Sequence, residues 1–242
     1  MATENVEIKK QLLDMLVQKQ ALKISKTTSD LFTFKSGRKS PNFANIGSLT
    51  DGESLSFLRK AFAKNVHDLV QSGEMEDFDF VFGPAYKGIP LATLLCDGLH
   101  EAYGWNKRML YDRKEAKNYG DKASDQTIVG AGFFKPGSRI LVIDDVITTG
   151  GAKLDALEKI RQLGECKVVG IAIAVDRQEK MGDAEKVEAL SAIQSIEKNF
   201  GIKTFPLLKM QDIFALVSPT LSPEIRKAWV EYYDKYGAIT LH

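Results

Sequence analysis

The chain has 242 residues, of which 44% are hydrophobic and 27% are charged, as is ordinary for a globular protein. Its 33 basic and 32 acidic residues leave a net charge of +1, which argues against a nucleic acid or a membrane surface as the principal partner. The two cysteines argue against a disulfide framework, and no Cys/His cluster has the spacing of a zinc site.

The distribution of apolar residues along the chain also indicates where in the cell the protein is expected. No apolar segment typical of a secretory signal follows Met1, and no apolar run approaches ~20 residues, the length that crosses a bilayer. We therefore expect a cytoplasmic protein with no membrane segment and no nucleic-acid partner.

The N-terminal part of the chain, 1–48, is expected to form a small hood-like subdomain. Apolar residues at helical spacing predict an amphipathic helix over 5–20. Two short predicted strands, 31–34 and 43–46, flank a turn at 35–38, and we expect them to pair as a hairpin.

Strands and helices then alternate through an expected core, 49–242, within a single domain. This alternation predicts an α/β fold with a mostly parallel central sheet, flanked by helices and joined by right-handed crossovers. Thr50 is the expected N-cap of the first core helix, which ends near Gly73. The remaining predicted strands are 79–82, 108–111, 128–134, 139–143, 168–175 and 203–206, and the remaining predicted helices are 90–102, 152–163, 184–199, 209–217 and 223–235.

A polar stretch at about 112–127 interrupts the alternation. It contains almost no aliphatic residue, and its charges have both signs. A solvated loop is the simpler interpretation. The functional interpretation is a mobile lid that brings Arg113, Lys114 and Lys117 onto an anionic ligand and keeps water out.

Four segments follow predicted strands, at 83–88, 112–117, 144–151 and 176–178. Ligands of open α/β sheets bind outside the carboxyl ends of the strands, so we expect these segments to converge on one crevice. The first of them, taken alone, is better explained as a glycine-rich turn with a solvated Lys87 than as a phosphate loop.

The stretch 139–151 carries the strongest signal. An aliphatic strand is followed by Asp144 and Asp145, and then by Thr148-Thr149-Gly150-Gly151 at a helix start. Backbone N–H groups of such a loop and helix predict an anion site. Two carboxylates beside it predict a ligand that also has hydroxyls or a divalent metal, such as a phosphorylated sugar. A plain acidic turn is the alternative.

The segment Val142-Ile-Asp-Asp-Val-Ile-Thr-Thr-Gly150 resembles the signature of the type I phosphoribosyltransferases, which bind 5-phosphoribosyl 1-diphosphate. The other segments resemble, in order, those of the orotate phosphoribosyltransferase family: Phe32-Thr-Phe-Lys-Ser-Gly-Arg-Lys-Ser-Pro41, Phe82-Gly-Pro-Ala-Tyr-Lys-Gly-Ile-Pro90, Arg113-Lys-Glu-Ala-Lys117 and Asp176-Arg-Gln-Glu179. The resemblance implies the type I phosphoribosyltransferase fold. It also implies transfer of the phosphoribosyl group to orotate, which gives orotidine 5-phosphate and pyrophosphate in pyrimidine biosynthesis.

The resemblance implies roles for individual residues. Asp144 and Asp145 would hold the ribose hydroxyls, and Lys117 would stabilise or protonate the leaving pyrophosphate; these three are the candidate catalytic residues. The rest of the phosphoribosyl diphosphate site would be formed by Lys35, Tyr86, Lys87, Arg113, Lys114, Tyr119, Val146, Ile147, Thr148, Thr149, Gly150, Gly151 and Ala152. The orotate site would be formed by Lys35, Phe43, Ala44, Thr148 and Arg177, with the Arg177 guanidinium facing the carboxylate.

Two positions depart from the family pattern. Ala44 stands where a second phenylalanine is common, and Tyr119 stands where a histidine is common. A phenol carries no positive charge near neutral pH, so Lys117 is expected to be the main contributor from the lid.

Mg²⁺ is the implied cofactor, bound mainly through substrate and not by direct protein ligands. A homodimer is also implied, in which Arg113 and Lys117 reach into the site of the partner subunit. Two rival interpretations remain. A purine phosphoribosyltransferase would share 140–151 but lack the pair Lys35 and Arg177. A regulatory protein that binds the ligand without turnover would lack an equipped lid.

Overall fold

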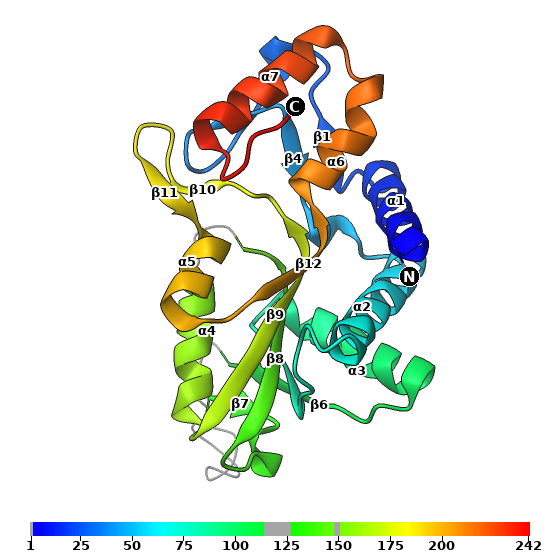
Figure 1. Ribbon diagram of the computed structural model, residues 1–242, viewed down its shortest axis with the longest axis vertical. Helices are drawn as coiled ribbons and strands as arrows, with labels where there is room; N and C mark the ends of the chain where they lie inside the picture. The colour runs from blue at the N-terminus through cyan, green and yellow to red at the C-terminus, as the bar shows by residue number, and fades with distance from the viewer. Residues whose placement is uncertain (1, 114–126, 148–150) are drawn as a thin grey trace.

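The computed structural model describes residues 2–113, 127–147 and 151–242 (Figure 1). Its centre is a six-stranded sheet in the order β12-β9-β8-β5-β6-β7. The strands are β5 (Phe80–Gly83), β6 (Arg108–Asp112), β7 (Ile128–Val129), β8 (Ser138–Val146), β9 (Cys166–Asp176) and β12 (Thr204–Lys209). Neighbours pair in parallel except β7, which is antiparallel to β6. The predicted mostly parallel α/β sheet is confirmed.

Helices cover both faces of this sheet (Figure 1). They are α1 (Ala2–Gln18), α2 (Gly52–Gln71), α3 (Gly88–Tyr103), α4 (Gly151–Gln162), α5 (Ala192–Phe200), α6 (Met210–Val217) and α7 (Pro223–Tyr236). Alternate strand residues enter separate cores: Val81 and Leu141 belong to the core of α1–α3, whereas Phe82 and Val142 belong to the core of α4 and α5. Because both faces of the sheet are covered by helices, successive residues of the central strands are apolar and do not alternate with polar ones.

The strand β8 extends beyond the predicted 139–143. Its parallel pairing with β9 continues as far as Val146 opposite Val175. Asp144 and Asp145 therefore lie within the strand, where ladder hydrogen bonds hold the backbone, and not in a loop after it.

The predicted pairing of the N-terminal strands is wrong. β2 (Phe32–Thr33) pairs with β3 (Lys39–Ser40), whereas β4 (Asn42–Ala44) pairs with β1 (Leu22–Ile24). The chain reverses early because Gly37 adopts the left-handed conformation, with φ of 77°. β1 has 3 residues, too few to show a period in the sequence.

The predicted helix 184–199 is also wrong over its first half. β10 (Lys180–Gly182) and β11 (Val187–Ser191) form an antiparallel hairpin before α5 begins. The Asp183 carboxylate accepts hydrogen bonds from two following backbone N–H groups and so stabilises the turn. Ser191 caps α5 through the backbone N–H of its third residue.

Two smaller expectations are corrected. The N-cap of α2 is Asp51 and not Thr50, because the Asp51 carboxylate accepts hydrogen bonds from two backbone N–H groups of the first turn. The predicted strand 128–134 shortens to β7, since Gly130 takes a φ of 88° and a 3₁₀ turn follows it.

Strands β1–β4 lie beside the C-terminal helices α6 and α7 (Figure 1). We call this layer, β1–β4 with α6 and α7, the hood. Leu12 of α1, Leu22 of β1, Phe214 of α6 and Trp229 of α7 belong to the same buried cluster as the sheet residue Val81. The hood therefore combines both ends of the chain and shares one core with the sheet.

We expect that replacing Trp229 with alanine lowers the free energy of unfolding by about 3–5 kcal/mol, because a large apolar side chain is lost and a cavity remains. Trp229 is 0% exposed, and its ring lies 5.5 Å from that of Phe214. Urea denaturation measures the loss. Leu216→Ala on α6, where the side chain is 41% exposed, is the control and should cost less than about 1 kcal/mol. Equal losses would contradict a core shared by hood and sheet.

Candidate active site

The carboxyl ends of four parallel strands lie at one edge of the sheet. They are those of β5, β6, β8 and β9, which end at Gly83, Asp112, Val146 and Asp176. Each is followed by one of the polar segments singled out in the sequence. The expected convergence at one edge of the sheet is thus observed for the described residues, but they do not line one crevice: Ile147 and Arg177 line one cavity, whereas Tyr86, Lys87 and Asp145 line another.

Two nearly buried carboxylates stand at the end of β8. Asp144 is 6% exposed and Asp145 is 7% exposed. Each accepts a hydrogen bond of 2.8 Å from the backbone N–H of the next residue, which fixes its orientation. The second oxygen of Asp145 lies 2.8 Å from Nζ of Lys87. Because the Lys87 side chain is 61% exposed, it can give up this carboxylate to a ligand hydroxyl and turn to another anion.

The glycine-rich loop 83–88 is anchored by Asp112. One oxygen of this carboxylate accepts a hydrogen bond of 2.6 Å from the backbone N–H of Ala85, and the other lies 2.5 Å from Nζ of Lys159 on α4. The sequence interpretation of Asp112 as part of a solvated loop or lid is therefore wrong. It ends β6, is 7% exposed and fixes the neighbouring loop.

Close backbone packing explains the two glycines of this loop. A Cβ atom on Gly88 would lie 2.6 Å from Cδ of Pro84 and 2.9 Å from the carbonyl oxygen of Ile143. A Cβ atom on Gly83 would lie 2.2 Å from the carbonyl oxygen of Gly88. The loop can thus press against β8 beside the acidic pair, while Tyr86 at its tip is 65% exposed.

A cavity of about 380 Å³ opens between the hood and the sheet edge. Its lining includes Lys35 and Phe43 from the hood, Ile147 after β8, and Arg177 after β9. These four were all predicted to bind ligand from resemblance alone, and the fold brings them together. Ala44 is not among the lining residues, because its side chain packs against the main core.

The guanidinium of Arg177 is held from two sides. It lies 4.3 Å from the centroid of the Phe34 ring. Its Nε and Nη2 atoms donate to Oε1 of Glu179 at 3.1 Å and 2.6 Å. Burial lowers the pKa of Arg177, but the negative charge and hydrogen bonds of Glu179 outweigh burial, so the net shift is upward. The guanidinium therefore stays charged inside the cavity wall.

Several predicted site residues lie outside the described part of the chain: Lys114, Lys117, Tyr119, Thr148, Thr149 and Gly150. Gly151 and Ala152 open α4, so its N-terminus follows the acidic pair after a short gap. Arg113 is half-buried, its backbone N–H donates to the carbonyl oxygen of Thr127, and its Nε atom is buried with no hydrogen-bond partner among the described residues.

Comparison with known proteins identifies the family to which the chain belongs. Residues 48–207 match the family model described as a phosphoribosyl transferase domain. The chain is 39% identical over 241 residues to the orotate phosphoribosyltransferase of Kluyveromyces lactis, with 98% of this chain and 99% of the relative covered. It is 42% identical over 216 residues to that of Neurospora crassa, with 86% and 88% covered. The crystal structure of the Francisella tularensis orotate phosphoribosyltransferase is 30% identical, has a TM-score of 0.76, and covers 94% of this chain and 99% of its own. The chain belongs to the orotate phosphoribosyltransferase family.

Membership of the orotate phosphoribosyltransferase family confirms the predicted fold and the prediction of an enzyme that transfers a pentosyl group. The regulatory protein without turnover, one of the two rivals, is therefore set aside. In the described part of the chain, no helix combines the length and the apolar character needed to cross a bilayer.

Sequence reasoning missed three charged residues at this edge of the sheet. They are Asp112, which anchors the loop 83–88, and Arg38 and Glu179, which belong to the wall of the cavity. Arg38 and Glu179 are inside segments that resemble the family, but only the fold shows them to be buried, with side chains 3% and 11% exposed.

Gly88→Ala should destabilise this protein by about 1–3 kcal/mol, because the added methyl group overlaps backbone that cannot move without disturbing β8. Thermal unfolding followed by circular dichroism measures the change. The control is Gly52→Ala at the start of α2, where a Cβ atom would meet nothing within 4 Å. If both variants unfolded at the wild-type temperature, the tight contact between loop and strand would be refuted.

Proposed function

We propose that the protein transfers the phosphoribosyl group of 5-phosphoribosyl 1-diphosphate to orotate, giving orotidine 5-phosphate and pyrophosphate in pyrimidine biosynthesis. One observation carries the proposal. A cavity with Arg177 and Lys35 in its wall opens at the same sheet edge as Asp144 and Asp145, and Ile147 belongs to that wall. A carboxylated base in the cavity would thus lie beside a ribose held by the acidic pair.

The donor would lie along the end of β8. Asp144 and Asp145 would accept hydrogen bonds from the ribose hydroxyls, with Lys87 released toward the diphosphate. The 5-phosphate would take the backbone N–H groups of 148–152, where α4 begins. The side chains proposed to contact the diphosphate are Lys35, Tyr86, Lys87, Arg113, Lys114, Lys117 and Tyr119.

The acceptor would occupy the cavity. Arg177 suits the orotate carboxylate because a guanidinium can donate two parallel hydrogen bonds to it. Phe43 lies in the wall, and its ring packs against those of Phe32 and Phe34 at 5.8 Å and 6.1 Å, so the ring that a pyrimidine would meet is held in place by apolar neighbours. Ala44 and Thr148 remain proposed contacts through their backbone or hydroxyl.

The chemistry needs positioning and charge stabilisation more than a nucleophilic side chain. The bond from ribose C1 to the pyrophosphate oxygen breaks, and pyrophosphate leaves with the electron pair. A ring nitrogen of orotate forms the new bond to C1 and gives up its proton. Lys117 is the residue proposed to stabilise or protonate the departing oxygen, and Asp144 and Asp145 stabilise the positive ribose.

Mg²⁺ is the proposed cofactor. Asp144 and Asp145 offer hard carboxylate oxygens, the kind of ligand atom that Mg²⁺ prefers. Such a site fits an ion that keeps several waters and is bound largely through the diphosphate and ribose oxygens. When bound there, Mg²⁺ would neutralise charge on the diphosphate.

We also propose a cytoplasmic homodimer in which Arg113 and Lys117 reach the site of the partner subunit. The resemblance of Arg113-Lys-Glu-Ala-Lys117 to the corresponding segment of the orotate phosphoribosyltransferase family supports this proposal.

The purified protein should consume orotate only when 5-phosphoribosyl 1-diphosphate and Mg²⁺ are both present. The loss of orotate absorbance measures turnover, and added EDTA should stop it. Hypoxanthine and adenine are the control acceptors. Equal use of a purine would contradict orotate as the acceptor, because the Arg177 guanidinium would then have no carboxylate to bind.

Replacing Lys117 with alanine should lower kcat at least about a hundredfold while diphosphate affinity changes far less, since the charge acts chiefly on the leaving group. Stopped assays and equilibrium binding measure the two quantities.

A mixture tests whether Lys117 acts across the dimer. Chains carrying Lys117→Ala are refolded with an equal amount of chains carrying Asp144→Asn and Asp145→Asn. Random pairing makes half the dimers hybrid, each with one intact site, so about a quarter of wild-type activity should return. Each variant refolded alone is the control. No recovery in the mixture would exclude a residue shared in trans.

A further inference from the structure

Glu179 lies between the guanidinium groups of Arg177 and Arg38, and all three residues belong to the wall of the cavity. Its Oε1 atom accepts from Nε and Nη2 of Arg177, and its Oε2 atom lies 3.6 Å from Nη1 of Arg38. The hydroxyl of Tyr232 on α7 donates to the same Oε2 atom at 3.1 Å. The Glu179 side chain is 11% exposed, so this carboxylate gains little from water and depends on these partners.

The contact with Glu179 leaves one edge of the Arg177 guanidinium for a ligand. A guanidinium has five N–H donors, and Glu179 accepts from Nε and from one N–H of Nη2. The remaining N–H groups, on Nη1 and Nη2, form a second parallel fork that matches a carboxylate. The Phe34 ring, 4.3 Å from Cζ, fixes the plane of the group. Glu179 thereby selects which edge of Arg177 is available.

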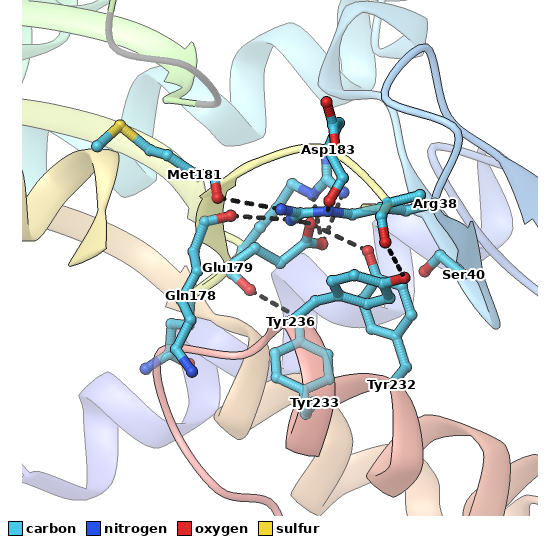
Figure 2. Close-up of polar contacts among 12 residues, drawn as sticks. Arg38, Ser40, Gln178, Glu179, Met181, Asp183, Tyr232, Tyr233 and Tyr236 are labelled. Atoms are coloured by element: carbon cyan, nitrogen blue, oxygen red, sulfur yellow. Dashed lines mark hydrogen bonds and ion pairs between the residues drawn. The ribbon is translucent and has the colours of Figure 1, made fainter. Parts of the chain in front are cut away.

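Glu179 itself is held by residues from distant parts of the chain (Figure 2). Arg38, with a side chain 3% exposed, donates to the carbonyl oxygens of Lys180, Met181 and Asp183, which fixes its guanidinium against the β10–β11 hairpin. The hydroxyl of Tyr233 donates to the carbonyl oxygen of Arg177 at 2.6 Å. The support of the acceptor site thus combines the hood turn, the hairpin and α7.

The charges around Arg177 favour an anion as the ligand of the cavity. Arg38 and Arg177 contribute two positive charges and Glu179 one negative charge, so one positive charge remains in a poorly hydrated place. Asp176 and Lys35 add one charge of each sign to the cavity wall, and burial raises the pKa of Asp176 toward its neutral form. Lys180, also in the wall, adds a further positive charge.

We propose that Glu179 is a positioning residue for acceptor recognition: it orients Arg177 so that one guanidinium edge receives the carboxylate of the base, while Arg38 and Tyr232 hold Glu179 in place. The inference rests on the proposed function, in which that base is orotate. It assigns to Glu179 the discrimination between carboxylated and uncharged pyrimidines, exerted through the orientation of the Arg177 guanidinium.

The test compares Glu179→Gln with the unsubstituted protein. The variant should raise the KM for orotate about tenfold or more, because the guanidinium loses a charge-assisted fork and samples other orientations. The KM for 5-phosphoribosyl 1-diphosphate should stay within about twofold, since the donor site does not involve Glu179. The ratio of kcat/KM for orotate over uracil, which lacks the carboxylate, should fall about tenfold.

Two further variants make the result specific. Tyr232→Phe, which removes only the hydroxyl that donates to Glu179, should produce a smaller change of the same kind and keeps the test open if Glu179→Gln does not fold. Glu188→Gln makes the same chemical change on an exposed residue of β11 and should leave both KM values unchanged.

The outcomes separate the two proposals. Equal changes in both KM values, or a lower melting temperature with both KM values unchanged, would give Glu179 a merely structural role and overturn the inference. An unsubstituted protein with no orotate turnover would overturn the proposed function itself, and the inference with it.

Discussion

Parallel pairing of β5, β6, β8 and β9 is the constraint on which the site depends, because it brings four carboxyl ends to one edge of the sheet. Helices cover both faces, so this edge is where polar residues from separate loops can meet without disturbing a core. The acidic pair, the glycine-rich loop and Arg177 come from strands far apart in the chain. Their proximity needs no direct contact among those segments, only the register of the strands that precede them.

Pairwise charge compensation then organises this edge. Asp145 is matched by Lys87, Asp112 by Lys159, and Arg177 by Glu179, and each pair includes at least one side chain about nine-tenths buried or nearly so. An unmatched charge in such a place would cost several kcal/mol. The ion pairs differ in how readily the two side chains can separate. Lys87 is 61% exposed and can leave Asp145, whereas Arg177 and Glu179 are 19% and 11% exposed and form a fixed part of the wall.

The wall of the cavity depends on parts of the chain that do not line it. Its lining residues run from Thr33 to Ile193, yet the tyrosines of α7 bind both the Arg177 carbonyl and the Glu179 carboxylate. Trp229 in the same helix joins the hood to the core of the sheet. The C-terminal helix is therefore joined both to the wall of the cavity and to the core of the sheet, so the hood is part of the fold and not a separate unit.

The sequence by itself determined the family, the mostly parallel α/β core and the four polar segments at the strand ends, because strand, loop and helix follow one another locally in the chain. It could not determine the partner of β2, the hairpin at 180–191 or the structural role of Asp112. Those depend on contacts between distant residues: Arg38 binds carbonyl groups more than a hundred positions away, and Asp112 meets Ala85 and Lys159. Whether a charged side chain is solvated or buried depends on what packs over it. Only the tertiary structure could therefore show that Asp112 is a buried anchor of a neighbouring loop and not a solvated charge.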